Sequence, residues 1–246
     1  MFRNISGWIS QLSQDPVNTL IEIVFMIAAL LLSLILHEIG HGFVALKCGD
    51  PTAKMMGRLT LDPRKHLDPI GAICMFFIGI GWAKPVPVNP YNFRNRSRDT
   101  VLVSFAGIGV NLILFLLSGL LLTLTMKAEG LAGVYKSLYE QGFSSLYSYS
   151  GQSPVIKYLQ LFLWLMLNFN LSLAVFNLIP VPPLDGFRLV NQIIFKGELN
   201  LSLQAMQIIH FAFLFICLSG LLSTAFGKVL DFCVRHAMLL FLGIFA

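Results

Sequence analysis

Long apolar runs are the feature of this sequence that most limits the folds it can adopt. Four such runs exceed the roughly 20 apolar residues that a helix needs to cross a bilayer. They lie at residues 23–46, between Glu22 and Lys47, and at residues 100–126, 158–184 and 199–227. Hydrophobic residues make up 56% of the chain and charged residues only 12%, which excludes both a disordered chain and a soluble enzyme. The sequence therefore predicts an all-α polytopic membrane protein.

Two further segments are apolar but differ from these four runs. The tail at 229–246 carries Asp231, Arg235 and His236, so it is either a fifth span or an interfacial helix. The segment 69–83 is uncharged but short, and it continues into the proline-rich stretch AKPVPVNP. A short apolar segment bounded by glycine and proline is typical of a re-entrant element. We therefore expect about five transmembrane helices plus one re-entrant, β-like element.

Basic residues flank the segment 69–83 on both sides. Lys47, Lys54, Arg58, Arg64 and Lys65 precede it, and a second basic group follows at residues 84–98. Cytoplasmic loops of membrane proteins carry an excess of Lys and Arg, so both groups are expected on the cytoplasmic side. The N-terminus then lies outside. The net charge of +5 is small and scattered, so no nucleic-acid partner is expected.

A metal-binding motif, H-E-x-x-H, lies inside the first apolar run. His37 and His41 are four residues apart, so on a helix the two imidazoles share one face, one turn apart. This spacing suits two ligands of one zinc ion, with Glu38 beside them to take a proton from zinc-bound water. Ionisable groups inside a membrane helix are costly, which favours a functional role over a polar helix end that reaches the interface.

Catalytic zinc usually takes three protein ligands, and Asp185 is the strongest candidate for the third. It follows the proline-rich end of the third run and precedes Gly186, and irregular backbone at membrane depth is tolerated where it lines a site. A solvated loop carboxylate is the alternative interpretation. If the segment 69–83 is re-entrant, Asp185 emerges on the same side as the two histidines. If that segment spans the membrane, Asp185 lies on the far face.

These motifs together resemble those of the site-2 protease family of intramembrane zinc metalloproteases, in its minimal prokaryotic form without a PDZ or CBS domain. The resemblance covers about residues 23–190. HEIGH matches the first family signature, and NLIPVPPLDG, residues 177–186, matches the second. The stretches RLTLDPRKHLDPIG and WAKPVPVNP are similar to the minimal members. AGIGVN, residues 106–111, is similar to the family pattern Ala-Gly-Pro-x-x-Asn, with Ile108 in place of proline.

The resemblance implies a zinc-dependent endopeptidase that hydrolyses peptide bonds within or next to transmembrane segments. It implies a zinc ion held by His37, His41 and Asp185, and it agrees with the role of Glu38 as general base. Asn111 is an amide donor in the middle of a span, and the resemblance implies that it lies near the site. We expect it to stabilise the oxyanion of the reaction, the alternative being a helix–helix hydrogen bond.

The extended PVPVN stretch offers backbone groups that could hold a substrate as an added strand. The candidate substrate-binding residues are Pro85, Val86, Pro87, Val88 and Asn177, the last of which is otherwise a cap for backbone freed by Pro180. The expected partners are a membrane-embedded protein or peptide and the lipid bilayer, in a prokaryotic plasma membrane.

The chain is expected to form one integral membrane domain over residues 1–246. Its catalytic core covers about residues 20–190, and residues 191–246 form accessory helices. The alternative function is a membrane zinc carrier or scaffold that uses the same ligands without hydrolysis and does not need Glu38.

Overall fold

The computed structural model describes residues 5–68, 71, 83–128 and 153–244. Its helices are α1 (Ile5–Gln14), α2 (Pro16–Lys47), α3 (Thr52–Met55), α4 (Pro63–His66), the 3-10 helix η1 (Pro90–Asn92), α6 (Arg96–Ala128), α9 (Pro154–Asn177), α10 (Asp185–Ile194), α11 (Leu203–Leu218) and α12 (Leu221–Ile244). Within the described residues, extended pairing is limited to one isolated antiparallel bridge. The predicted all-α polytopic architecture is confirmed.

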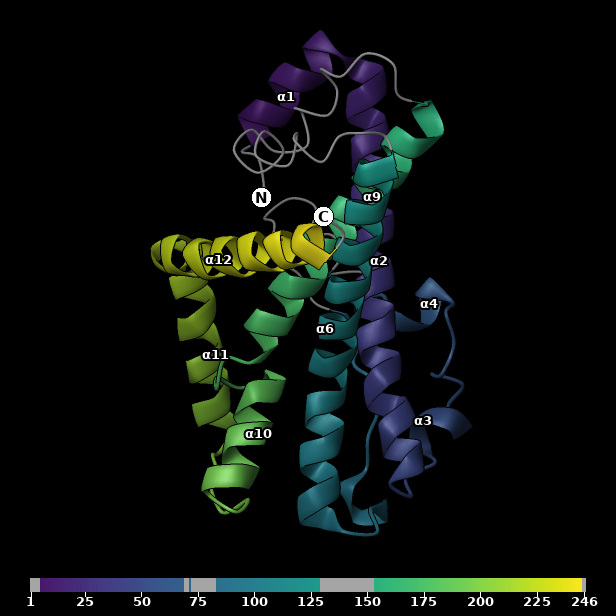
Figure 1. Ribbon diagram of the computed structural model, residues 1–246. Helices are drawn as coiled ribbons and strands as arrows, with labels where there is room; N and C mark the ends of the chain where they lie inside the picture. The colour runs from purple at the N-terminus through teal and green to yellow at the C-terminus, as the bar shows by residue number, and fades with distance from the viewer. Residues whose placement is uncertain (1–4, 69–70, 72–82, 129–152, 245–246) are drawn as a thin grey trace.

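Three long helices, α2, α6 and α9, run side by side and form the centre of the molecule (Figure 1). Among the described residues, these are the three that are long and apolar enough to cross a membrane. The predicted runs at 23–46 and 100–126 lie inside α2 and α6. In the third run, 158–184, the prolines from Pro180 onward were expected to break the helix, and α9 ends at Asn177, just before them.

Both ends of α2 are specified by local sequence. The Asp15 carboxylate caps the first turn by accepting a hydrogen bond from the Asn18 N–H, and Pro16 occupies the first helical position. At the other end Gly49 has φ of +110°, and the Asp50 N–H donates to the Ala45 carbonyl at 2.9 Å. This is a Schellman termination, which turns the chain away from the helix less than two turns after His41.

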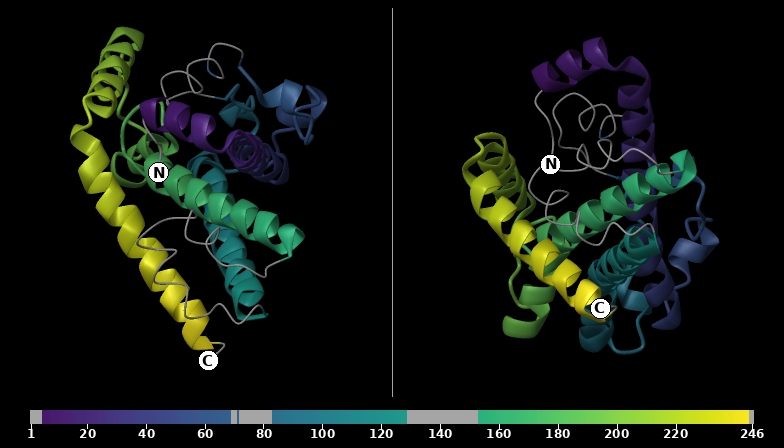
Figure 2. Two further views of the ribbon diagram at one scale, coloured as in Figure 1. Left: turned by 90° about the horizontal axis from the view of Figure 1, so that it is seen from above. Right: turned by 45° about the horizontal axis from the view of Figure 1, so that its top comes forward.

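The C-terminal region differs from the prediction. A single span over residues 199–227 was expected, and this is wrong, because α11 ends at Leu218 and α12 begins at Leu221. Gly220 between them has φ of +78°, a conformation that glycine adopts without strain. α12 lies across α6 and α9 rather than along them (Figure 1). Most of the tail at 229–246 is part of this helix. The two further views place α11 and α12 together on the side away from α2 (Figure 2).

The expected re-entrant element falls almost entirely outside the described residues, but its two ends are defined. Leu67 and Ala83 form the antiparallel bridge, and the Lys84 N–H donates to the His66 carbonyl at 2.8 Å. The chain therefore leaves and returns at the same place. The basic stretch before this segment therefore ends, and the one after it begins, at the Leu67–Ala83 bridge.

The apolar core is divided between two parts of the bundle. The largest cluster joins α6, α9 and α12, and consists of Phe115, Leu122, Met126, Leu161, Leu163, Leu167, Leu171, Val234, Met238 and Phe241. The other part of the bundle has smaller clusters and a set of fully buried polar side chains, among them Asn111 and Asn170. The predicted metal-binding residues lie in this second part.

Candidate metal centre

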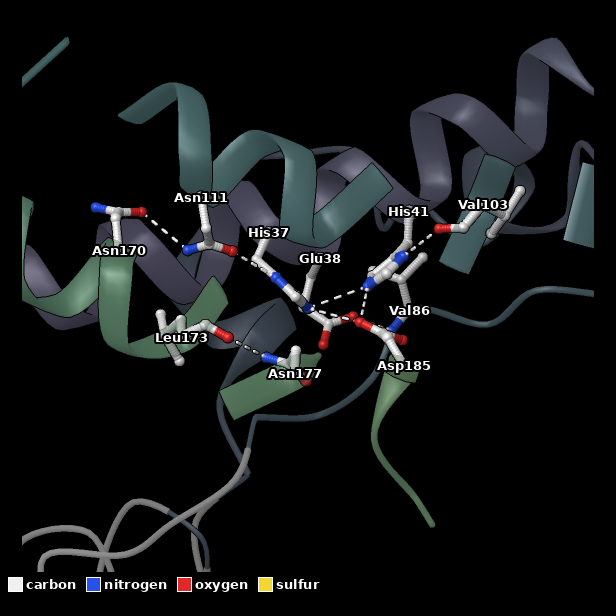
Figure 3. A network of polar contacts seen from close by, with 10 residues as sticks. All are labelled: His37, Glu38, His41, Val86, Val103, Asn111, Asn170, Leu173, Asn177 and Asp185. Atoms are coloured by element: carbon white, nitrogen blue, oxygen red, sulfur yellow. Dashed lines mark hydrogen bonds and ion pairs between the residues drawn. The ribbon is translucent and has the colours of Figure 1, made fainter. Parts of the chain in front are cut away.

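His37, His41 and Asp185 converge from two helices onto one point (Figure 3). The Nε2 atoms of the two histidines are 3.0 Å apart, and Asp185 Oδ2 lies 3.3 Å from His37 Nε2 and 3.0 Å from His41 Nε2. All three residues are buried, with exposed fractions of 6–8%. The structure thus brings together the two histidines of the first span and the carboxylate that the sequence analysis placed with them.

The opposite nitrogen of each imidazole faces an oxygen atom. His41 Nδ1 lies 2.7 Å from the Val103 backbone carbonyl, and His37 Nδ1 lies 2.5 Å from Asn111 Oδ1. A carbonyl oxygen can only accept, so each Nδ1 carries the hydrogen and donates it. In the neutral imidazole each Nε2 then presents a lone pair, the form in which histidine binds a metal.

Two Nε2 lone pairs and one carboxylate oxygen therefore face each other without a hydrogen-bond donor between them. Among the described residues, Asp185 Oδ2 is buried and has no hydrogen-bond partner. Three acceptors at such short range repel one another unless a cation lies between them. Zinc ligands at about 2.0–2.1 Å from a tetrahedral ion lie roughly 3.3 Å apart, close to the spacing observed here. The donor set fits zinc.

Gly107 provides the space beside this donor set. A Cβ at this position would meet His37 Nε2 at 2.7 Å and would come closer still to His41 Nε2. Both nitrogens face the metal position, so any larger residue would fill part of the room that the ion requires. Steric crowding thus explains why glycine is required at Gly107, the first glycine of AGIGVN, which the motif resemblance alone did not show.

The Asp-Gly turn is held tightly against the end of α9. A Cβ on Gly186 would meet the backbone carbonyls of Leu178 and Ile179, so only glycine allows this approach. Asp185 begins α10, where the helix dipole favours a negative charge. This close turn brings the carboxylate of Asp185 back to α2.

Glu38 lies on the same cavity and contacts the proline-rich stretch. Its Oε2 accepts a hydrogen bond from the Val86 N–H at 2.7 Å, and this is the one hydrogen bond of Glu38 among the described residues. The cavity has a volume of about 150 Å³. Its lining includes the predicted residues His37, Glu38, His41, Pro85, Val86, Val88, Asn177 and Asp185. Pro87 is absent from this lining.

Two buried charged residues that the sequence analysis did not single out as site residues hold the extended stretch in place. The Arg58 guanidinium donates to the backbone carbonyls of Lys84 and Pro85 at 2.8 and 3.1 Å. The Asp50 carboxylate accepts from the Asn89 N–H at 2.7 Å. Arg58 counted only toward the basic loops in the sequence, because a contact across 26 residues leaves no local pattern. The stretch is therefore fixed along its length by side chains from the loop after α2.

The two predicted asparagines lie in different surroundings. Asn177 lines the cavity, and its amide donates to the Leu173 carbonyl of its own helix at 3.0 Å. Asn111 is fully buried behind the His37 ring, away from the cavity lining. Its Nδ2 donates to Asn170 Oδ1 at 2.9 Å. One N–H of its amide is thus used by Asn170, and because Asn111 does not line the cavity, it contacts His37 of the candidate metal site rather than the space where an oxyanion would form.

A bundle of apolar helices that buries a His-His-Asp donor set next to a glutamate defines a membrane metallopeptidase. The sequence profile of Peptidase family M50 matches residues 25–220, and the chain belongs to this family, the site-2 protease family. It is accordingly an integral membrane zinc-dependent metalloprotease, and it acts on protein substrates in a lipid environment.

Individual relatives carry the names of zinc metalloproteases. The chain is 36% identical over 221 residues to YwhC of Bacillus subtilis (strain 168), covering 90% of this chain and 92% of YwhC. It is 32% identical over 187 residues to Rip2 of Mycobacterium tuberculosis (strain ATCC 25618 / H37Rv), covering 74% of this chain and 61% of Rip2. No solved structure matches the chain.

Proposed function

We propose that this protein hydrolyses peptide bonds within or next to transmembrane segments of its substrates. The observation that carries the proposal is the position of the donor set and Glu38, which line a cavity between helices that are long and apolar enough to span a bilayer. A peptide bond must reach this cavity to be cut. A membrane-embedded protein or peptide is therefore the substrate class that fits.

In this proposal His37, His41 and Asp185 hold the zinc ion. Zinc held there would act as a Lewis acid on the scissile carbonyl and would lower the pKa of a bound water. Glu38 takes the proton from the attacking water and passes it to the leaving amine nitrogen. Its Oε2 is engaged by Val86, so Oε1 is the atom available for this transfer.

The stretch 85–88 holds the substrate as an extended strand in this proposal. Pro85 and Pro87 lack an N–H, and Val86 gives its N–H to Glu38. The Val88 N–H has no hydrogen-bond partner among the described residues, so it is free to pair with a substrate carbonyl. A substrate that also takes the Val86 N–H releases Glu38 Oε2, which couples substrate binding to the freedom of the base.

The protein is proposed to reside in a prokaryotic plasma membrane with its N-terminus outside and its metal centre toward the cytoplasm. The bridge between Leu67 and Ala83 supports this orientation, because it brings the two basic stretches to one face. Loops rich in Lys and Arg remain on the cytoplasmic side. Cysteine accessibility in intact cells at Lys54 and Ser10 would test it, with labelling expected only at position 10.

The decisive test of hydrolysis is Glu38→Gln in the purified, zinc-loaded protein reconstituted in lipid with a transmembrane substrate. We expect cleavage to fall roughly 10²–10⁴-fold, the usual contribution of a general base, while one zinc per chain remains bound. Glu22→Gln, on the same helix but outside the cavity, is the matched control. Full cleavage by E38Q would overturn the proposal. Zinc transport by the wild type that is unchanged in E38Q would favour the alternative function, a zinc carrier.

The strand hypothesis is tested separately with Val88→Pro, which removes the free N–H and leaves the metal ligands intact. We expect cleavage to fall while zinc content stays the same. Val88→Ala keeps the N–H and shortens the side chain, so it serves as the control. Equal cleavage by the two variants would refute the role of this amide.

A further inference from the structure

A line of buried polar side chains leads away from the candidate metal centre, starting at the His37 ring (Figure 3), and neither of its asparagines lines the cavity. It begins at His37 on α2, passes through Asn111 on α6 and reaches Asn170 on α9, which also contacts Ser33 of α2. Asn111, Asn170 and Ser33 each have an exposed fraction of 0%. Polar groups so deeply buried are costly unless every one of them is hydrogen-bonded.

Each amide in this line uses its oxygen on one side and its nitrogen on the other. Asn111 Oδ1 lies 2.5 Å from His37 Nδ1, and Asn111 Nδ2 donates to Asn170 Oδ1 at 2.9 Å. Asn170 Nδ2 then donates to the Met166 carbonyl at 2.8 Å and to Ser33 Oγ at 2.9 Å. Both hydrogens of the Asn170 amide therefore have acceptors.

The Met166 carbonyl sets the direction of the whole line. A backbone carbonyl can only accept, so Asn170 must present its nitrogen to Met166 and its oxygen to Asn111. Asn111 must then present its nitrogen to Asn170 and its oxygen to His37. His37 Nδ1 is thereby obliged to donate, and the lone pair of the neutral ring is left on Nε2, the atom that faces His41 and Asp185.

We infer that Asn170 is a positioning residue, which acts through Asn111 to fix the tautomer and the orientation of His37 for metal binding. This inference rests on the proposed role of His37 as a metal ligand. It also gives Asn111 a role that its buried amide can fulfil. A partner on the outer nitrogen of a metal-binding histidine fixes ring orientation, and its loss typically weakens metal binding or activity 10–100-fold.

A merely structural role would make Asn170 equivalent to other asparagines that tie helices or turns together. Asn168, two residues earlier on α9, offers the comparison, because its amide donates to the Trp164 carbonyl of the same helix at 2.8 Å. It is partly buried and has no part in the line to His37. Replacing each asparagine with leucine removes an amide of the same size from the same helix.

The experiment measures metal affinity and the ligand field in Asn170→Leu, Asn168→Leu and the wild-type protein. Zinc affinity is measured by competition with a chelator, and the visible absorption of the cobalt-substituted protein reports ligand geometry. We expect N170L to bind zinc 10–100-fold more weakly with an altered cobalt spectrum, and N168L to match the wild type. If N170L does not fold, Asn170→Ala removes the same acceptor without the added bulk.

Ser33→Ala provides a further check on the direction of the line. It removes one acceptor of Asn170 and leaves the Met166 carbonyl, so zinc affinity should stay within a few-fold of the wild-type value. If N170L binds zinc as tightly as N168L and the wild-type protein do, the role of Asn170 alone is overturned. If the His37→Ala variant binds zinc as tightly as the wild-type protein does, the proposed metal centre is overturned instead.

Discussion

The two halves of the helical bundle are held together in different ways. In the half that contains the candidate metal centre, α2, α6 and α9 are joined by hydrogen bonds between buried side chains, such as those from His37 to Asn111 and from Asn111 to Asn170. In the other half, α6 and α9 meet α12 mainly through apolar side chains of the main cluster, beside one long hydrogen bond from Thr123 Oγ1 to Met238 Sδ at 3.8 Å. There a Cβ on Gly119 would lie 2.8 Å from the Phe241 ring, which shows how closely α12 approaches α6.

Different interactions therefore determine the geometry of the site and the attachment of α12. Lipid tails are as apolar as leucine, so apolar helix contacts in a membrane depend on close fit rather than on escape from water. Hydrogen bonds between buried groups, in contrast, specify particular atoms and directions. Changes in the metal half should therefore alter metal binding, and changes in the α12 half should alter stability alone.

The largest effect is expected for Gly107→Ala in the metal half. The added methyl group would contact the Nε2 atoms of both His37 and His41, so we expect loss of stoichiometric zinc and of detectable cleavage. Zinc content of the purified protein by mass spectrometry is the measurement. In Gly109→Ala, on the same helix, the methyl group would meet only the Phe105 ring at 3.6 Å, and zinc content should be unchanged. Zinc-replete G107A would contradict the assigned geometry.

A smaller effect, confined to stability, is expected for Met238→Ala in the α12 half. Met238 is fully buried in the main cluster, and truncation of such a side chain usually costs about 2–5 kcal/mol. Thermal unfolding in detergent should show the loss, while zinc affinity stays at the wild-type value. Leu240→Ala, at a position that is 61% exposed, should change neither quantity. A drop in zinc affinity of M238A would break the division between the two halves.

The smallest effect is expected for Asp50→Asn, in the loop that holds the extended stretch. Burial raises the pKa of the Asp50 carboxyl, but hydrogen bonds from Thr52, Asn89 and Asn92 outweigh it and lower the pKa below its ordinary value. We expect the free energy of unfolding of D50N to be about 1–3 kcal/mol below that of the wild type at neutral pH, because the neutral amide cannot replace a carboxylate that accepts these bonds.

The pH dependence follows from the direction of this shift. A carboxyl group whose pKa is lowered on folding stabilises the protein above its unfolded pKa of about 3.9 and loses that contribution as the pH falls through the folded pKa. The stability difference between wild type and D50N should therefore shrink below about pH 4. Asp62→Asn is the control, since its carboxylate pairs with Arg64 on an exposed turn. A difference that grows on acidification would contradict the assignment.

Local sequence patterns predicted much of the fold and the inner part of the site. Apolar length predicted α2, α6 and α9, and the four-residue spacing predicted the shared face of His37 and His41. The same logic failed at residues 199–227, because a single glycine inside an apolar run does not reveal whether it adopts a left-handed conformation. Gly220 does so, and the chain turns there.

Contacts between distant parts of the chain were the features that sequence patterns did not provide. Asn170 was visible as a polar residue in an apolar run, but its contact with Asn111 depends on the packing of α6 against α9. The bonds of Asp50 and Arg58 to the extended stretch likewise depend on how the loops fold together. The assignment of Asn111 to an oxyanion rested on its depth in a span and on the family resemblance, neither of which fixes the direction of its amide.

The two prolines of the extended stretch limit how much chain this protein can pair with. Pro85 and Pro87 leave Val86 and Val88 as the only backbone donors between residues 85 and 88. An edge so poor in donors cannot act as a template for strand pairing between copies of the protein. If a substrate pairs with this stretch as proposed, the ladder is very short, and a substrate helix would need to unwind over little more than the bond that is cut.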